Sequence, residues 1–160
     1  MQLPASRRER WYRDFIRTYI NRDLAELGLG VSDQAFGRLL RMVAYAPGGL
    51  FNASAFASSL TFTNDTVMRY MSILEESFLI RSLQPWLPNL KERLVKSPRL
   101  FIRDSGLVIP LLGINDFIDM LGRPEAGAIW EGYVIEEICR IVEDKAELYF
   151  TEVEVVRSWI

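Results

Sequence analysis

The chain has 160 residues, of which 49% are apolar and 25% are charged, and its formal net charge is −2. This length is enough for one domain or two very small ones, and the composition is typical of a folded globular protein. Histidine is absent and Cys139 is the single cysteine. These counts exclude Ser-His and Cys-His nucleophilic sites, histidine-ligated metals, structural zinc sites and an internal disulfide.

Signals for membranes, secretion and nucleotide binding are also missing. No apolar run approaches the roughly 18 residues of a membrane helix, and the basic N-terminus has no apolar core of a secretory signal. Neither a GxxxxGK[ST] nor a GxGxxG motif occurs. We therefore expect no membrane insertion, no bound cofactor and a reducing, cytoplasmic location.

The N-terminal part predicts one amphipathic helix over residues 7–27, ended by Gly28. Its apolar stripe includes Trp11, Phe15, Ile16, Tyr19, Ile20 and Leu24. Packing on the domain core is the simpler interpretation. The alternative is a docking helix for a partner module, because several aromatic residues lie close to the start of the chain.

Three short helices are predicted next, between residues 36 and 76. Apolar residues at i, i+3, i+4 and i+7 spacing mark the first and third helices, and Pro47-Gly48-Gly49 ends the first. Asn52 or Ser54 is expected to cap the second helix, which includes Phe56 and Leu60. The predicted buried positions are Phe36, Leu39, Leu40 and Val43 in the first helix and Val67, Tyr70, Met71 and Leu74 in the third.

Two strands follow, at residues 78–83 and 100–102, with a basic loop over residues 85–98 between them. A helix-turn-helix followed by a β-hairpin is a winged helix, which we place at residues 31–103. Charge is unevenly distributed along the chain. Residues 77–103 hold six basic side chains and one acidic one, whereas residues 104–160 hold four basic and twelve acidic ones. The basic hairpin suggests contact with a polyanion.

An ordered set of motifs covers most of residues 11–150. The segments are residues 19–24, 49–52, 66–70, 73–75, 89–98, 104–107 and 127–131. Together they resemble the domain of unknown function that forms the C-terminal half of many prokaryotic AAA-type ATPases. This resemblance implies a preceding ATPase module, which the chain lacks, and a C-terminal region similar to restriction endonucleases.

The C-terminal residues depart from that family. The helix expected at residues 127–143 and the strand at 148–150 match, but Glu154 stands where the family has aspartate, and the sequence ends at Ile160. We therefore expect an α+β, predominantly helical chain with an N-terminal helix at 1–30, a winged helix at 31–103 and a small, incomplete α/β unit at 104–160. An unpaired sheet edge in this unit predicts self-association.

Duplex DNA is the predicted partner, because a helix-turn-helix presents its second helix to the major groove. The outward residues of that helix that suit base or phosphate contact are Asn64, Thr66, Arg69 and Ser72. Phosphate contacts are expected from the wing residues Lys91, Arg93, Lys96 and Arg99. The alternative is a winged helix that docks protein, including an ATPase module, without nucleic acid.

A degenerate metal-dependent nuclease is the third possibility. Its available carboxylates are Glu131, Glu136, Glu152 and Glu154. No lysine follows the last pair at the position such a site needs, so we expect neither a catalytic site nor a metal site. We instead expect Glu136 and Glu137 on the solvated face of the helix at 127–143, with Trp130 and Tyr133 packing it on the sheet and Cys139 buried among apolar neighbours.

Overall fold

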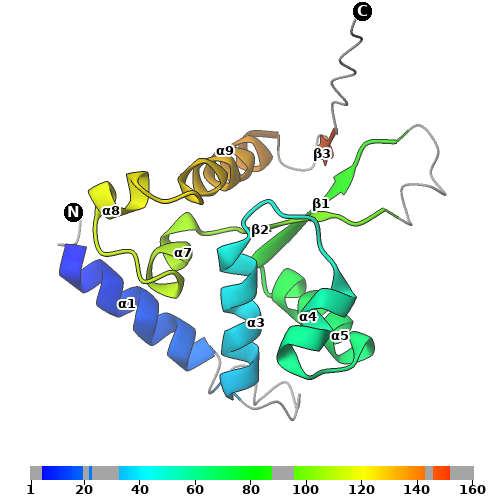
Figure 1. Ribbon diagram of the computed structural model, residues 1–160. Helices are drawn as coiled ribbons and strands as arrows, with labels where there is room; N and C mark the ends of the chain where they lie inside the picture. The colour runs from blue at the N-terminus through cyan, green and yellow to red at the C-terminus, as the bar shows by residue number, and fades with distance from the viewer. Residues whose placement is uncertain (1–4, 20–21, 23–32, 88–95, 143–145, 152–160) are drawn as a thin grey trace, which may run out of the picture.

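The computed structural model describes residues 5–19, 22, 33–87, 96–142 and 146–151. The chain is α+β and mostly helical, as predicted (Figure 1). Its helices are α1 (Ala5–Thr18), α3 (Asp33–Tyr45), α4 (Ala53–Leu60), α5 (Asn64–Glu76), α7 (Ser105–Leu111), α8 (Phe117–Leu121) and α9 (Ala126–Val142). Its strands are β1 (Ile80–Pro85), β2 (Arg99–Ile102) and β3 (Tyr149–Phe150). Helices α3, α4 and α5 followed by the β1–β2 hairpin form a winged helix.

The winged-helix core lies between α3, α5 and the hairpin. Phe36, Leu39, Leu40 and Val43 of α3 are each at most 1% exposed, which confirms the predicted apolar face. The four predicted residues of α5 are buried as well. Burial of these eight side chains gives each helix a single possible orientation on the core.

Side-chain caps define where the two short helices begin. The side-chain oxygen Oδ1 of Asn52 accepts a hydrogen bond from the Ala55 N–H at 3.0 Å and caps the start of α4. Thr63 Oγ1 accepts one from the Thr66 N–H at 3.2 Å and starts α5. Between them, Thr61 ends α4 in the left-handed conformation at φ +57°. The helix-turn-helix geometry is therefore fixed by local polar contacts.

The sheet has the strand order β2-β1-β3. Strands β1 and β2 are antiparallel, with Ile80 opposite Ile102 and Leu83 opposite Arg99. Strand β3 is parallel to β1, with Gln84 opposite Tyr149, so a C-terminal strand extends the sheet of the wing hairpin. Figure 1 shows α9 next to this sheet and α3, α4 and α5 grouped below it.

Strand β1 starts two residues later than the sequence predicted. Phe78 has φ +60° and terminates α5, with the Leu79 N–H donating to the Leu74 carbonyl at 2.9 Å and the Phe78 N–H to the Glu75 carbonyl at 3.0 Å. This pair of bonds is a Schellman motif, in which glycine usually occupies the left-handed position. The chain therefore enters the sheet only at Ile80.

Helix α9 is rotated relative to the prediction. Its buried residues are Ile129, Gly132, Ile135 and Glu136. Glu136 is 8% exposed, whereas Trp130 is 65% and Tyr133 is 43% exposed. The expectation that Glu136 is solvated and that the two aromatic residues pack on the sheet is therefore wrong.

Two contacts between α9 and the sheet explain this rotation. Gly132 lets the helix approach Phe101, since a Cβ at Gly132 would lie 3.2 Å from the Phe101 ring. Arg81 and Arg103 lie on the hairpin beneath α9, and each donates a hydrogen bond to Glu136. Burying a charge requires a partner of opposite sign, so the carboxylate turns inward.

Helix α1 packs against α7. Phe15 and Ile16 are half-buried and Tyr19, which follows the helix, is buried. Trp11, which we predicted in the same apolar stripe, is 53% exposed, so that part of the prediction is wrong. Gly28, the predicted end of this helix, falls outside the described residues. No helix in the described part of the chain is both long enough and apolar enough to span a bilayer.

Candidate nucleic-acid interface

The four predicted base-reading residues all lie on α5. Asn64, Arg69 and Ser72 are exposed and Thr66 is half-buried, on the side of the helix away from the core. Met68, which is 49% exposed, belongs to the same surface. The side of α5 away from the core is therefore mostly polar, with the exposed Met68 within it.

Two of these side chains already have roles at the helix start. Asn64 Nδ2 donates to Ser54 Oγ at 3.4 Å and so joins α5 to α4. Thr66 Oγ1 lies 2.8 Å from Thr63 Oγ1, the capping hydroxyl. To bind a base or a phosphate, each residue would have to exchange or share these contacts. Their main effect in the free protein is to fix the angle between α4 and α5.

Arg69 is the longest cationic side chain on this surface. Its guanidinium carbon lies 5.5 Å from the ring centroid of Tyr70, a cation–π distance. Ser72, one turn further along, donates from Oγ to the Met68 carbonyl at 3.2 Å. Asp65 is also exposed on α5, and its carboxylate would repel a phosphate at this surface. Arg69 is therefore the residue of α5 best suited to a guanine edge or a phosphate oxygen.

The wing is described only in part. Lys91 and Arg93 lie outside the described residues, and Lys96 is exposed. Arg99 is directed toward α9: its Nη1 lies 3.8 Å from Glu131 Oε1, and its guanidinium carbon lies 5.0 Å from the Phe150 ring centroid. Because its side chain is only 33% exposed, Arg99 would have to give up part of this contact to reach a phosphate. Its role in DNA binding stays a prediction.

A buried ion-pair cluster joins the hairpin to α9. Arg81 binds Glu136 through two nitrogens, Nε and Nη2, the latter at 3.1 Å, and Arg103 Nε lies 3.0 Å from Glu136 Oε2. Burial by itself raises the pKa of Glu136, but hydrogen bonds from both arginines outweigh it and hold that pKa below its usual value. The hydrogen bonds that Arg81 donates to Glu136 likewise raise the pKa of Arg81. Arg81 and Glu136 are therefore both charged at neutral pH.

This cluster changes the electrostatic account of the hairpin. Of the six basic residues in 77–103, Arg81, Arg99 and Arg103 face acidic residues of α9. These three arginines are therefore partly neutralised by α9, and the predicted phosphate contacts of Lys91, Arg93 and Lys96 stay a prediction. The sequence does carry a signal for this cluster. Arg81 and Arg103 flank the apolar segments of the two strands, and Glu136 follows two apolar residues of α9, so these charges need each other for compensation.

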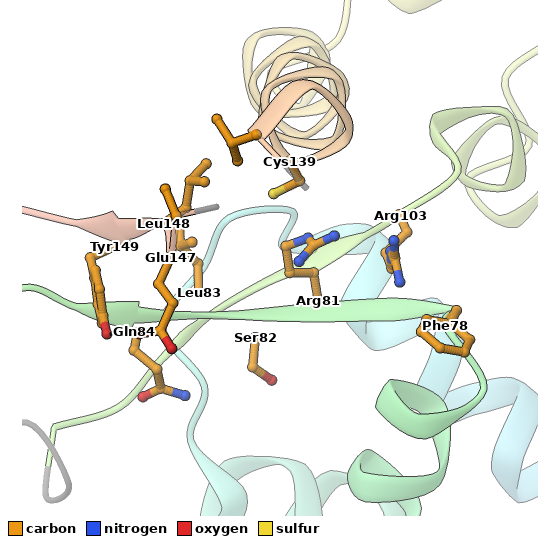
Figure 2. Close-up of a pocket in the computed structure, with 12 residues that line it drawn as sticks. Phe78, Arg81, Ser82, Leu83, Gln84, Arg103, Cys139, Glu147, Leu148 and Tyr149 are labelled. Atoms are coloured by element: carbon orange, nitrogen blue, oxygen red, sulfur yellow. Dashed lines mark hydrogen bonds between the residues drawn. The ribbon is translucent and has the colours of Figure 1, made fainter. Parts of the chain in front are cut away.

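A cleft of about 570 Å³ lies beside the cluster, between β1, α9 and the chain leading into β3 (Figure 2). Cys139 lines it and is half-buried rather than fully buried, in partial agreement with the sequence prediction. Burial raises the pKa of the Cys139 thiol, so the sulfur is uncharged at neutral pH. The lining is Phe78, Arg81, Ser82, Leu83, Gln84, Arg103, Cys139, Val142, Ala146, Glu147, Leu148 and Tyr149.

The carboxylates considered for a nuclease are not gathered. Within the described residues, no group of three or more Cys, Asp and Glu side chains is placed to hold a metal ion. Glu136 is neutralised by two arginines, and Glu131 is exposed on another side of α9 and faces Arg99. Glu152 and Glu154 fall outside the described residues.

The fold and these surfaces define a winged-helix protein with an added C-terminal helix and strand. The chain belongs to the family described as Domain of unknown function (DUF8612), which matches residues 2–117. It is 35% identical over 140 residues to the uncharacterized proteins Mb2031c of Mycobacterium bovis and Rv2008c of Mycobacterium tuberculosis. The match covers 88% of this chain but 32% of each relative, so the chain spans about a third of their length.

Among solved structures, the chain matches MepR, a transcription regulator of the Staphylococcus aureus multidrug efflux pump MepA, at 14% identity and a TM-score of 0.38. That match covers 87% of this chain and 99% of MepR. A MepR mutant bound to an oligodeoxyribonucleotide gives 15% identity and a TM-score of 0.39, with 88% of this chain and 99% of that chain covered. Similarity at this level carries no conclusion about what the present chain binds.

Proposed function

We propose that the chain is a non-catalytic DNA-binding or targeting module that contacts duplex DNA through α5 and the basic wing. The observation that carries the proposal is the α5 surface: Arg69 stands exposed on a helix that Asn52 and Thr63 caps hold at a fixed angle to α4. In helix-turn-helix proteins, the helix in this position enters the major groove.

The wing supplies the second half of the proposed interface. Lys96 is exposed at its described end, and Lys91 and Arg93 precede it in the sequence. Lysine and arginine in such a loop contact phosphates and position the protein without reading sequence. Base discrimination would then come from Arg69, with smaller contributions from Asn64, Thr66 and Ser72.

We further propose that the module serves an AAA-type ATPase in the cytoplasm. This part rests on the ordered motifs between residues 19 and 131. The greater length of the mycobacterial relatives leaves room for such a module, since this chain spans 32% of each. The ATPase would supply the nucleotide chemistry, and the winged helix would supply the target.

Protein docking is the second candidate, and the outer face of α9 favours it. Trp130, Tyr133, Ile138 and Ile141 are 65%, 43%, 42% and 75% exposed on this one helix. Exposed apolar side chains in such numbers are typical of surfaces that bind protein. Self-association through the edge of the sheet, expected from the sequence, stays a prediction.

Fluorescence anisotropy with a random-sequence duplex at low salt separates the two candidates. We expect Arg69→Ala to weaken binding about tenfold, because an arginine contact to a base or phosphate is worth roughly 1–3 kcal/mol. Arg140→Ala is the matched control, since Arg140 is an exposed arginine of α9 paired with Glu137. Absence of wild-type binding at low salt would reject the DNA-binding proposal and leave protein docking.

A further inference from the structure

The cleft beside the ion-pair cluster has two chemically different ends. Arg81 and Arg103 lie at one end, while Leu83, Cys139 and Leu148 form an apolar wall (Figure 2). Its volume, about 570 Å³, lies within the range of small-molecule sites. Such sites combine an apolar lining with a few polar groups that fix the orientation of the ligand.

The arginines retain hydrogen-bonding capacity beyond Glu136. Arg81 uses Nε and Nη2, and Arg103 uses Nε alone. Among the described residues, Nη1 of Arg81 and both Nη atoms of Arg103 have no hydrogen-bond partner. Two cations share one carboxylate at this end of the cleft. Glu147 lies toward the other end, where its carboxylate accepts the hydrogen bond of the Tyr149 hydroxyl.

Phe78 adds a feature that helix termination does not require. It occupies the left-handed position at the end of α5, at φ +60°, where glycine would be the usual residue. Its ring is 72% exposed at the rim of the cleft, with the Arg103 guanidinium carbon 5.2 Å from the ring centroid. An aromatic side chain kept in a disfavoured backbone conformation, with little burial in return, is a reason to look for function.

We propose that this cleft binds a small organic acid with one negative charge. Its carboxylate pairs with the free guanidinium N–H groups of Arg103 and Arg81, and its aryl or alkyl part lies between Phe78 and the apolar wall. The planar fork of arginine suits a carboxylate. Arg81 and Arg103 against Glu136 leave one excess positive charge at this end of the cleft, which suits a single carboxylate.

Binding can be measured without DNA, so the result is independent of the proposed function. The probe is benzoate, titrated into the full chain while arginine Nε–Hε and aromatic resonances are followed by NMR. We expect saturable shifts at Arg81, Arg103 and Phe78 with a Kd of about 1 mM, as for a ligand of this size. Benzamide, which has the same ring without the charge, should give no saturable shift.

Three variants test the assignment of the site. Arg103→Gln should weaken benzoate binding about tenfold or more, as expected for loss of a charged hydrogen bond. Phe78→Ala should weaken benzoate binding several-fold. Because this side chain is mostly exposed, we expect the variant to fold, so it still tests the site if Arg103→Gln does not fold. Arg140→Gln, an exposed arginine of α9 outside the lining, should bind as the wild type does.

Three results would overturn the proposal. The first is the absence of saturable shifts at the two arginines in the wild type. The second is equal shifts with benzamide, and the third is unchanged benzoate affinity in folded Arg103→Gln and Phe78→Ala. Any of them would mean that the cluster serves only to hold α9 on the hairpin.

Discussion

Arg103 and Glu136 lie 3.0 Å apart, from Nε to Oε2, and connect the end of the wing hairpin, directly after β2, to α9. The same carboxylate accepts two hydrogen bonds from Arg81 on the first wing strand. Glu136 is 8% exposed, so one buried carboxylate ties both strands of the hairpin to the C-terminal helix. Glu136 is therefore a charged contact between the hairpin and α9, beside the packing of Gly132 on Phe101.

Removing this carboxylate should destabilise the fold. Glu136→Ala leaves two partly buried arginines without a counter-charge, and we expect a loss of about 2–3 kcal/mol in the free energy of unfolding. Glu137→Ala is the matched control, because Glu137 pairs with Arg140 on the surface and should cost less than about 0.5 kcal/mol. Urea unfolding measures both, and equal losses would contradict the structural role of Glu136.

The Glu136 carboxylate should also make the free energy of unfolding depend on pH. Arg81 and Arg103 hold the folded-state pKa of Glu136 below its usual value of 4.5, despite the opposing effect of burial. The unfolded chain then binds the proton more tightly, so stability rises with pH through this range. The contribution is complete above about pH 4.5 and is lost as pH falls below it toward the folded-state pKa.

Comparison of the wild type with Glu136→Gln isolates this effect. The stability difference between the two proteins should be largest near neutral pH and should shrink as the pH falls below about 4.5. Thermal or urea unfolding across this pH range measures it. A difference that stays constant down to pH 3 would show that Glu136 is not ionised in the folded protein.

Phe78 should respond to substitution as a strained residue. Glycine adopts φ +60° without steric cost, whereas the left-handed conformation costs other residues about 1–2 kcal/mol. The larger entropy of glycine in the unfolded chain and loss of the contact with Arg103 offset part of this gain. We expect Phe78→Gly to raise the free energy of unfolding by up to about 1 kcal/mol.

Gly113 provides the reverse test of the same conformation. It has φ +63°, and a Cβ there would meet no atom within 4 Å. Gly113→Ala should therefore cost about 1 kcal/mol through backbone strain alone. A clear loss of stability in Phe78→Gly, measured by urea unfolding, would show that the aromatic ring contributes more to the fold than its 72% exposure suggests.

The orientation of α9 can be tested with two aromatic substitutions. Phe101 is 1% exposed beneath the helix, and Phe101→Ala should cost about 3–5 kcal/mol. Trp130 is 65% exposed, and Trp130→Ser should cost less than about 1 kcal/mol. A larger loss for Trp130→Ser than for Phe101→Ala in equilibrium unfolding would mean that α9 packs on the sheet through its Trp130 face, as the sequence predicts.

The winged helix could be read from sequence because its signals are local. Caps at Asn52 and Thr63, the break at residues 47–49 and two apolar faces at helical spacing each depend on neighbours within a few positions. The register of α9 could not be read in this way. The face of α9 that is turned to the sheet depends on Arg81 and Arg103, which lie 55 and 33 residues from Glu136 in the chain.

For the candidate interface, too, only the features set by local sequence could be predicted. Periodicity placed Arg69 and Ser72 correctly on the outer surface of α5. Counting charges could not reveal that Arg81, Arg99 and Arg103 face α9, since that depends on long-range packing. The cleft also escaped prediction, because β3 and α9 join the wing sheet only in three dimensions.

The central claim is tested most directly by the salt dependence of DNA binding. Anisotropy titrations of a random duplex across a salt series should give a slope of log K against log salt of about −3 to −4 for four phosphate contacts. The variant Lys91→Ala/Arg93→Ala/Lys96→Ala should reduce the slope to about −1. A control variant, Arg10→Ala/Arg13→Ala/Arg17→Ala, removes the same charge from exposed positions on α1. It should keep most of the wild-type slope. Equal slopes in the wing variant and the wild type, or no binding at low salt, would contradict the account.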